Sequence, residues 1–136
     1  MDPNPFLVFA IETAKSAGKI LLNHFGEISS FNHKSTDIDL VTIADTESES
    51  YIVKQIQSKY PKHQIIAEES ALKKGCSDYQ WIIDPLDGTT NFVHNLPIFA
   101  VSIGLQYKQE TIAAVVYNPA AEKCFWAKKN KGAFLY

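Results

Sequence analysis

The chain has 136 residues, a formal net charge of −2 and a hydrophobic fraction of 46%. The length suits one domain with a real core, and the slightly negative charge argues against a nucleic-acid-binding protein. No apolar stretch is long enough to cross a membrane, and the N-terminus lacks a signal-peptide pattern, so we expect a cytoplasmic protein without a membrane partner.

Two helices are predicted in the first 60 residues. The first begins near Asn4-Pro5 and ends at Gly26, a usual helix stop. The second runs from about Ala44 to Lys59, so that Asp45 lies at the helix start, where the helix dipole favours a carboxylate. The apolar stripe of the first helix comprises Phe6, Phe9, Ala10, Thr13, Ala14, Ala17, Ile20, Leu21 and Phe25.

The remainder of the chain is predicted to be rich in strands. Short apolar strands at 65–67 and 81–83 are followed by a short helix from Thr89 to about His94. A hairpin pairs 100–107 with 111–117, and two more strands cover 123–128 and 133–136. Helices followed by consecutive strands predict an α+β fold, with two helices packed on a largely antiparallel sheet.

The most informative segment is IIDPLDGTTNF, in which two carboxylates follow a strand directly. Asp84 and Asp87 supply the oxygen ligands that Mg²⁺ prefers, and the proline between them leaves the Leu86 carbonyl able to turn toward a metal. Gly88 permits close approach to the backbone, and Thr89 opens a helix whose N–H groups favour an anion. An Asx-type turn after a strand is the alternative interpretation.

A second pair of acids, Glu68 and Glu69, follows the strand at 65–67. Alone, the pair is typical of a solvated loop, but ligands gather at strand ends in layered α/β folds. Four carboxylates in one cleft repel each other strongly unless cations lie between them. The combination therefore predicts a site for divalent cations and a phosphate.

Together these segments resemble the inositol monophosphatase family along essentially the whole chain. The sequence after the Asp-Gly resembles this branch rather than nucleotide 3′-phosphatases or fructose bisphosphatases. Ala67 stands where the family often has glycine, which is a minor departure. The segments that carry the resemblance are Asp39-Leu40-Val41-Thr42 with Asp45, Glu68-Glu69-Ser70, and Trp81 through Phe92 continuing into 93–97 and 100–104.

The resemblance implies that residues 1–136 form the N-terminal metal- and phosphate-binding domain of a layered αβαβα fold. Family members are about twice as long, as two domain-sized units would be. Their second half carries a Trp-Asp motif whose aspartate completes the metal site. Trp126 is followed by Ala127 and two lysines, with no acid, so we expect that the C-terminal domain is absent from this chain.

The resemblance also implies how two or three Mg²⁺ ions are held. Glu68, Asp84 and the Leu86 carbonyl are expected to bind the first ion. Asp84 and Asp87 are expected to bind the second, together with the missing C-terminal aspartate, while Glu68 reaches a weaker third ion.

The remaining roles concern the phosphate and the attacking water. Thr89, hydrogen-bonded to Asp45, is expected to orient the water, and the Gly88 and Thr89 N–H groups are expected to hold the phosphate beside Asp87. Glu69 is expected to steady the cluster by hydrogen bonds. Lys34 aligns with a family lysine near the mouth of the site, and an exposed loop lysine is the equally supported alternative.

The function implied by the resemblance is Mg²⁺-dependent hydrolysis of an inositol monophosphate, or another small phosphate monoester, by metal-activated water. Inhibition by Li⁺ and a homodimeric full-length form are implied in the same way. Two alternatives stay open. In the first, the chain is a non-catalytic half that binds metal or acts as an interaction module. In the second, it is a regulator that binds the transcription machinery, as some bacterial members of the family do.

Overall fold

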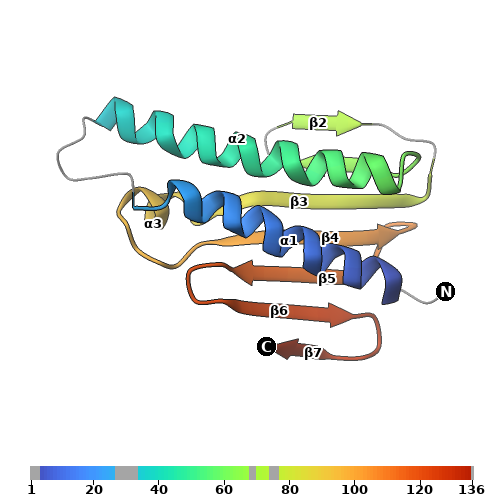
Figure 1. Cartoon of the computed structure of the whole chain (residues 1–136). Coiled ribbons are helices and arrows are strands. Elements are labelled where there is room, and N and C mark those ends of the chain that lie inside the picture. The colour runs from blue at the N-terminus through green and yellow to red at the C-terminus, as the bar shows by residue number, and fades with distance from the viewer. Residues whose placement is uncertain (1–3, 27–33, 68–69, 74–76, 136) are drawn as a thin grey trace.

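A computed structural model of the chain describes residues 4–26, 34–67, 70–73 and 77–135; for 34–39 and 70–73 it describes only the backbone. Two long helices, α1 (Asn4–His24) and α2 (Lys34–Lys59), lie side by side on one face of a seven-stranded sheet (Figure 1). The predicted class, α+β with two helices on a largely antiparallel sheet, is therefore confirmed. None of the described helices combines the length and the hydropathy needed to span a membrane.

Helix α1 has close to the predicted limits, and six of the nine predicted stripe residues are buried, while Phe6, Ile20 and Phe25 are half-buried. Its buried positions include Phe9, Ala14 and Leu21, and the chain leaves the helix at Gly26, whose φ is +88°. The sequence did not reveal that Gly18 is also a contact position. A Cβ added there would lie 2.8 Å from the Tyr117 ring, so the missing side chain lets α1 approach the sheet closely.

Helix α2 begins earlier than predicted, at Lys34 instead of about Ala44. The β-branched run before Ala44 is a weak helix former on its own. Tertiary packing favours the helix in part of this segment, because Leu40 and Val41 pack against the core cluster. Asp45 therefore lies well inside α2, and the prediction that it lies at the N-terminal end of the helix, where the dipole favours a carboxylate, is wrong.

The sheet contains one parallel pair of strands in an otherwise antiparallel arrangement. Its order is β2-β1-β3-β4-β5-β6-β7, with β1 parallel to β3 and every other neighbouring pair antiparallel. Strand β2 was not predicted. The bounds are β1 (Gln64–Ala67), β2 (Ser70–Lys73), β3 (Tyr79–Asp87), β4 (Ala100–Tyr107), β5 (Glu110–Asn118), β6 (Lys123–Lys128) and β7 (Ala133–Leu135), with the short helix α3 (Thr89–Val93) between β3 and β4.

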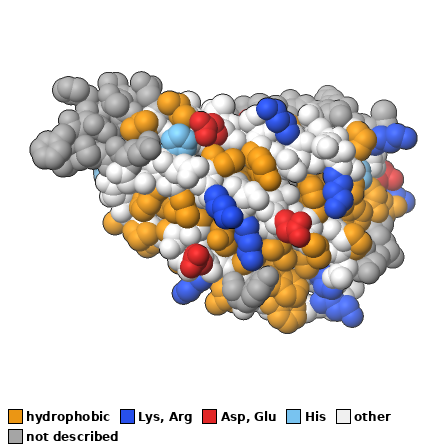
Figure 2. Space-filling view, viewed as in Figure 1, with side chains coloured by type: hydrophobic (Ala, Val, Ile, Leu, Met, Phe, Trp, Pro, Cys, Tyr) orange, Lys and Arg blue, Asp and Glu red, His pale blue; other side chains and the backbone are white. Residues whose placement is uncertain are grey.

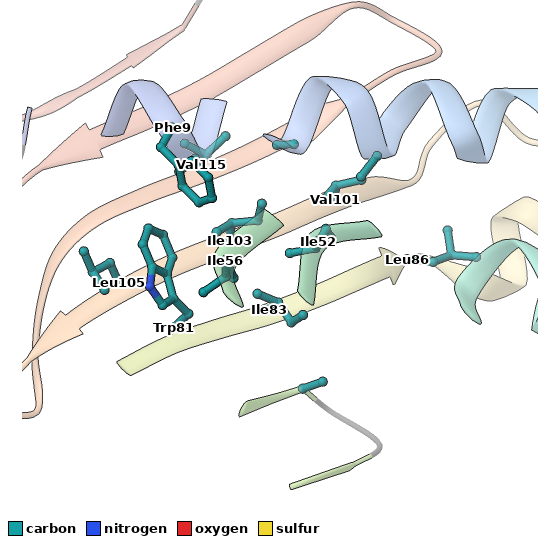
Figure 3. Close-up of a cluster of buried hydrophobic side chains, with 14 of the residues drawn as sticks. Phe9, Ile52, Ile56, Trp81, Ile83, Leu86, Val101, Ile103, Leu105 and Val115 are labelled. Atoms are coloured by element: carbon teal, nitrogen blue, oxygen red, sulfur yellow. The ribbon is translucent and has the colours of Figure 1, made fainter. Parts of the chain in front are cut away.

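The core lies between the two long helices and the central strands. Helix α1 contacts β4, β5 and β6, whereas α2 contacts β3 and α3. Side chains from both helices and from the central strands meet in one cluster (Figure 3). On the outer surface seen in Figure 2, apolar patches alternate with dispersed basic and acidic side chains.

The other face of the sheet, called the open face below, carries apolar residues that the described helices do not cover. Alternation along the strands explains this, since residues between the buried positions point the opposite way. Ile82 is 41% exposed and Phe125 is 45% exposed. Two rows of register partners define the open face, the first formed by Ile66, Ile82, Gly104, Ala114 and Ala127 and the second by Asp84, Ser102, Val116, Phe125 and Leu135.

Candidate functional site

A β-bulge at the end of β3 carries the two aspartates of the central motif. Asp84 is opposite Ser102 and Asp87 is opposite Ala100, so three steps along β3 face two steps along β4. The extra residue falls where Pro85 has no N–H to give to the ladder. One oxygen of Asp84 accepts a hydrogen bond from the Leu86 N–H at 3.3 Å, so an Asx-type turn is present within the bulge.

The bulge places both aspartates on the same side of the sheet. Residues three apart in a regular strand point to opposite faces, but Ser102 and Ala100 are two apart and share a face. Their register partners Asp84 and Asp87 share that face with them. A surface hollow of about 280 Å³ adjoins Asp84 and Ser102 on the open face. The carboxylates are thus directed toward the open face and away from the core.

The turn after Asp87 is tightly packed. Gly88 has φ +89° and ψ 41°, and a Cβ added there would lie 3.0 Å from the Ile98 carbonyl oxygen. The Asn91 side chain donates to the same carbonyl at 2.8 Å, which ties α3 to the chain before β4. Thr89 begins α3, as predicted, and its side chain is exposed.

Helix α2 is fastened to the bulge by a serine that the sequence interpretation missed. The Ser48 hydroxyl donates to the Pro85 carbonyl at 2.8 Å, and Ser48 is fully buried. Asp45 precedes Ser48 by three residues and so lies on the same side of α2. The spacing of Ala44, Ser48 and Ile52 every four residues was the available sequence signal.

The helices that carry Asp45 and Thr89 contact each other, since α2 packs against α3. Asp45 is half-buried and Thr89 is exposed. The contact between the two helices does not test the expected pairing, so the hydrogen bond between Asp45 and Thr89 stays a prediction.

The parallel pair of β1 and β3 brings two acidic segments to one edge of the sheet. Ala67, the last residue of β1, is the register partner of Ile83, which directly precedes Asp84. Glu68 and Glu69 follow Ala67 in the sequence and lie outside the described residues.

The other predicted ligands are only partly placed. Lys34 is the first residue of α2, and the structure describes its backbone alone, so the loop alternative is wrong for its backbone conformation. Within the described part of the chain, no group of three or more His, Cys, Asp or Glu side chains is arranged to hold one metal ion. The predicted set needs Glu68, which is not among those residues.

Comparison with known proteins extends these observations beyond single motifs. The family model described as "Inositol monophosphatase family" matches residues 2–136. The chain is 40% identical to inositol monophosphatase 3 of Solanum lycopersicum and 45% identical to Nus factor SuhB of Pasteurella multocida; each match covers 96% of this chain and 50% and 49% of the relative, respectively. A solved structure of the extragenic suppressor protein SuhB from Bartonella henselae superimposes with a TM-score of 0.86 at 36% identity, covering 96% of this chain and 51% of that chain.

The chain thus spans about half the length of the curated relatives it matches. The family model matches residues 2–136, and the superposition on the Bartonella henselae structure covers 96% of this chain. Because the family model extends over nearly the whole sequence, the chain belongs to the inositol monophosphatase family.

Proposed function

We propose that this chain supplies one half of the active site of a Mg²⁺-dependent phosphatase that hydrolyses inositol monophosphate or a related small phosphate monoester. The observation that carries the proposal is the end of the parallel β1–β3 pair. There, Ala67 lies opposite Ile83, and a bulge turns Asp84 and Asp87 to a common face. Membership of the inositol monophosphatase family supports the same chemistry.

The donor atoms at this edge have the chemistry that Mg²⁺ prefers. Carboxylate and carbonyl oxygens are hard ligands, and this motif offers both within four residues. Glu68, Asp84, Asp87 and the Leu86 carbonyl would hold the ions. A bound Mg²⁺ supplies charge stabilisation and a more acidic water for attack on phosphorus.

The residues after the bulge would bind the phosphate and manage the proton. Gly88 brings the backbone close to a ligand because it has no side chain, and the N–H groups of Gly88 and Thr89 would donate to phosphate oxygens beside Asp87. Asp45, held in place by α2, would accept a hydrogen bond from the Thr89 hydroxyl. That hydroxyl would then orient the attacking water and pass on its proton.

Further residues would support this arrangement from its margin. Glu69 would accept hydrogen bonds that steady the acidic cluster, and Lys34 would lie near the mouth of the site. The exposed apolar rows of the open face support the view that residues 1–136 are the N-terminal metal- and phosphate-binding domain of a two-domain enzyme. Substrate choice, inhibition by Li⁺, the homodimer and a cytoplasmic location remain parts of the proposal that rest on the family resemblance.

Phosphate release from inositol 1-phosphate tests the proposal directly. The 136-residue chain is compared with the protein translated to its natural stop codon, each with Mg²⁺, with EDTA, and with Mg²⁺ plus Li⁺. We expect Mg²⁺-dependent release that Li⁺ inhibits, and only in the longer protein. Release from neither protein, on this ester and on a panel of sugar and nucleotide monophosphates, would refute the phosphatase assignment.

A matched pair of variants separates the site from the fold. Asp87→Asn removes a predicted metal ligand with little change in volume and is expected to abolish turnover. Asp78→Asn changes an exposed aspartate just before β3 and is expected to leave turnover unchanged. Circular dichroism should show the same fold in both variants. Normal turnover in Asp87→Asn would remove this residue from the metal site.

A second candidate is a binding role, which is favoured by relatives named Nus factor SuhB at 45% and 41% identity. In this case the chain acts through a protein partner and need not turn over substrate. Affinity capture from a bacterial lysate, followed by identification of RNA polymerase subunits, tests this role. Capture that survives Asp87→Asn would show that binding and hydrolysis are separate.

A further inference from the structure

A stack of rings surrounds His63 in the turn between α2 and β1. The imidazole lies parallel to the Tyr60 ring at 4.8 Å and nearly parallel to the Tyr79 ring at 4.6 Å. Phe6 of α1 packs against the same imidazole at 6.0 Å. One histidine therefore contacts rings from α1, from the residue that follows α2 and from β3.

The imidazole also accepts a hydrogen bond from the core. The Trp81 indole Nε1–H donates to His63 Nδ1 at 3.0 Å, and Trp81 is fully buried. Indole has one donor and no acceptor, so this bond satisfies the entire polar capacity of the Trp81 side chain. The bond requires the neutral imidazole, in which Nδ1 accepts and Nε2 carries the proton.

Protonation removes that acceptor. Both nitrogens of an imidazolium are donors, so the Trp81 N–H would face another N–H inside the core. Aromatic faces attract a cation, and the Tyr60 and Tyr79 rings would offset part of this loss. The offset is partial, because the free energy of a cation–π contact at an exposed site is smaller than the free-energy cost of leaving the buried Trp81 N–H without an acceptor.

The charged and titratable groups around His63 favour the same state. The Tyr60 and Tyr79 hydroxyls have pKa values raised by burial, so both rings are neutral near pH 7. The Lys59 ammonium lies 6.0 Å from the Tyr60 ring, and Lys62 adjoins His63 in the chain. These two groups add positive charge on the α2 side.

On the sheet side, Asp78 precedes Tyr79 and is exposed, while Tyr107 of β4 packs on Tyr79 with ring centroids 4.7 Å apart. No ion pair joins His63 to a carboxylate of the described residues. Burial lowers the pKa of His63, in agreement with this environment.

We propose that His63 is a proton-sensitive clamp, which in its neutral form ties the start of β1 and the two long helices to Trp81 of β3. The clamp lies at the start of the parallel pair, since Ile65 is the register partner of Trp81. Figure 3 places Trp81 beside Phe9 in the same core cluster, so release of the indole loosens the contact of α1 with the sheet as well. The clamp does not depend on the proposed phosphatase activity.

The direction of the pH effect follows from the lowered pKa. In the unfolded chain His63 is protonated with the ordinary histidine pKa of 6.5, whereas in the folded chain its pKa is lower. The stabilising contribution of His63 is therefore fully present above pH 6.5. This contribution is lost as the pH falls through the lowered pKa of His63 in the folded state.

Nuclear magnetic resonance of the protein translated to its natural stop codon tests the clamp. Histidine Cε1–H and tryptophan Nε1–H signals are followed from pH 8.5 to pH 4.5, with His63 and Trp81 assigned from the His63→Asn and Trp81→Phe spectra. We expect His63 to titrate below 6.5 and the Trp81 indole signal to shift with the same midpoint. A His63 titration midpoint at or above pH 6.5, or a Trp81 indole signal that does not shift as His63 titrates, would overturn the proposal.

Urea unfolding at pH 7.5 and pH 5.5 gives the second readout. His63→Asn keeps an acceptor near the position of Nδ1 but does not titrate, so its urea midpoint should fall less on acidification than that of the unchanged protein. His94→Asn, at an exposed histidine, should behave as the unchanged protein does. An equal fall of the urea midpoint in the unchanged protein and in His63→Asn would contradict the clamp. If His63→Asn fails to fold, the nuclear magnetic resonance titration of the unchanged protein decides.

Discussion

Replacement of Gly88 by alanine tests how tightly the turn after the acidic bulge is built. Gly88 has φ +89°, in the left-handed region that side chains disfavour. The new Cβ would lie 3.0 Å from the Ile98 carbonyl oxygen and 3.3 Å from Phe99 Cα. Both neighbours are backbone atoms at the entrance to β4, so neither moves without disturbing the strand.

The expected loss of stability has two parts. Placing an L-residue in the left-handed conformation costs about 1–2 kcal/mol. Crowding against backbone adds an overpacking cost of about 1–3 kcal/mol. The sum of about 2–5 kcal/mol is a large share of the roughly 5–15 kcal/mol by which domains are stable.

Urea unfolding followed by circular dichroism measures the loss, and a second glycine provides the matched control. Gly132 has φ +79°, but a Cβ there would meet nothing within 4 Å. Gly132→Ala therefore carries the backbone cost alone. The difference between the two variants reports the contact with the chain before β4. If Gly88→Ala loses no more stability than Gly132→Ala, the turn is not packed as described and the argument fails.

Three other predictions concern α2, the buried thiol and the open face. Ser48→Ala should cost about 1–3 kcal/mol of unfolding free energy, because the buried Pro85 carbonyl loses its donor, while Ser50→Ala at an exposed position should change it little. Burial raises the pKa of the Cys124 thiol, so iodoacetamide should modify Cys124 at pH 8 only in denaturant. Peptide mass spectrometry separates this label from one on Cys76, and rapid labelling of Cys124 in the folded chain would contradict the burial. The 136-residue chain should self-associate through the open face, and Phe125→Lys should reduce this in sedimentation velocity; a concentration-independent monomer of the unchanged chain would refute it.

The elements that sequence periodicity predicted well are those whose packing agrees with their local preferences. Helix α1 combines a proline near its start, a glycine after its end and a regular apolar stripe. Strands β4, β5 and β6 alternate apolar and less apolar residues between evident turns, and their predicted limits agree with the structure to within one residue. Local chemistry and tertiary packing favour the same state in these segments.

The features that could not be predicted depend on partners far apart in the chain. The early start of α2 lies in a β-branched segment that reads as non-helical on its own. Ser48 looks like an ordinary exposed helix serine until Pro85 is placed beside it. His63 has no ligand spacing in the sequence, and its contacts appear only when Trp81 and two tyrosine rings surround it.

Strand β2 explains how the two acidic segments reach one edge of the sheet. Successive strands joined by a short turn run antiparallel, and that arrangement would send the residues after β1 and after β3 to opposite edges. Strand β2 runs back along the outer side of β1 and returns the chain to the starting edge, so β3 pairs with β1 in parallel. Because β2 was not predicted, there was no reason from the sequence to expect the parallel pairing of β1 with β3. A strand without a ligand of its own is therefore what brings Ala67 opposite Ile83, and with them the two segments from which a cation site can be built.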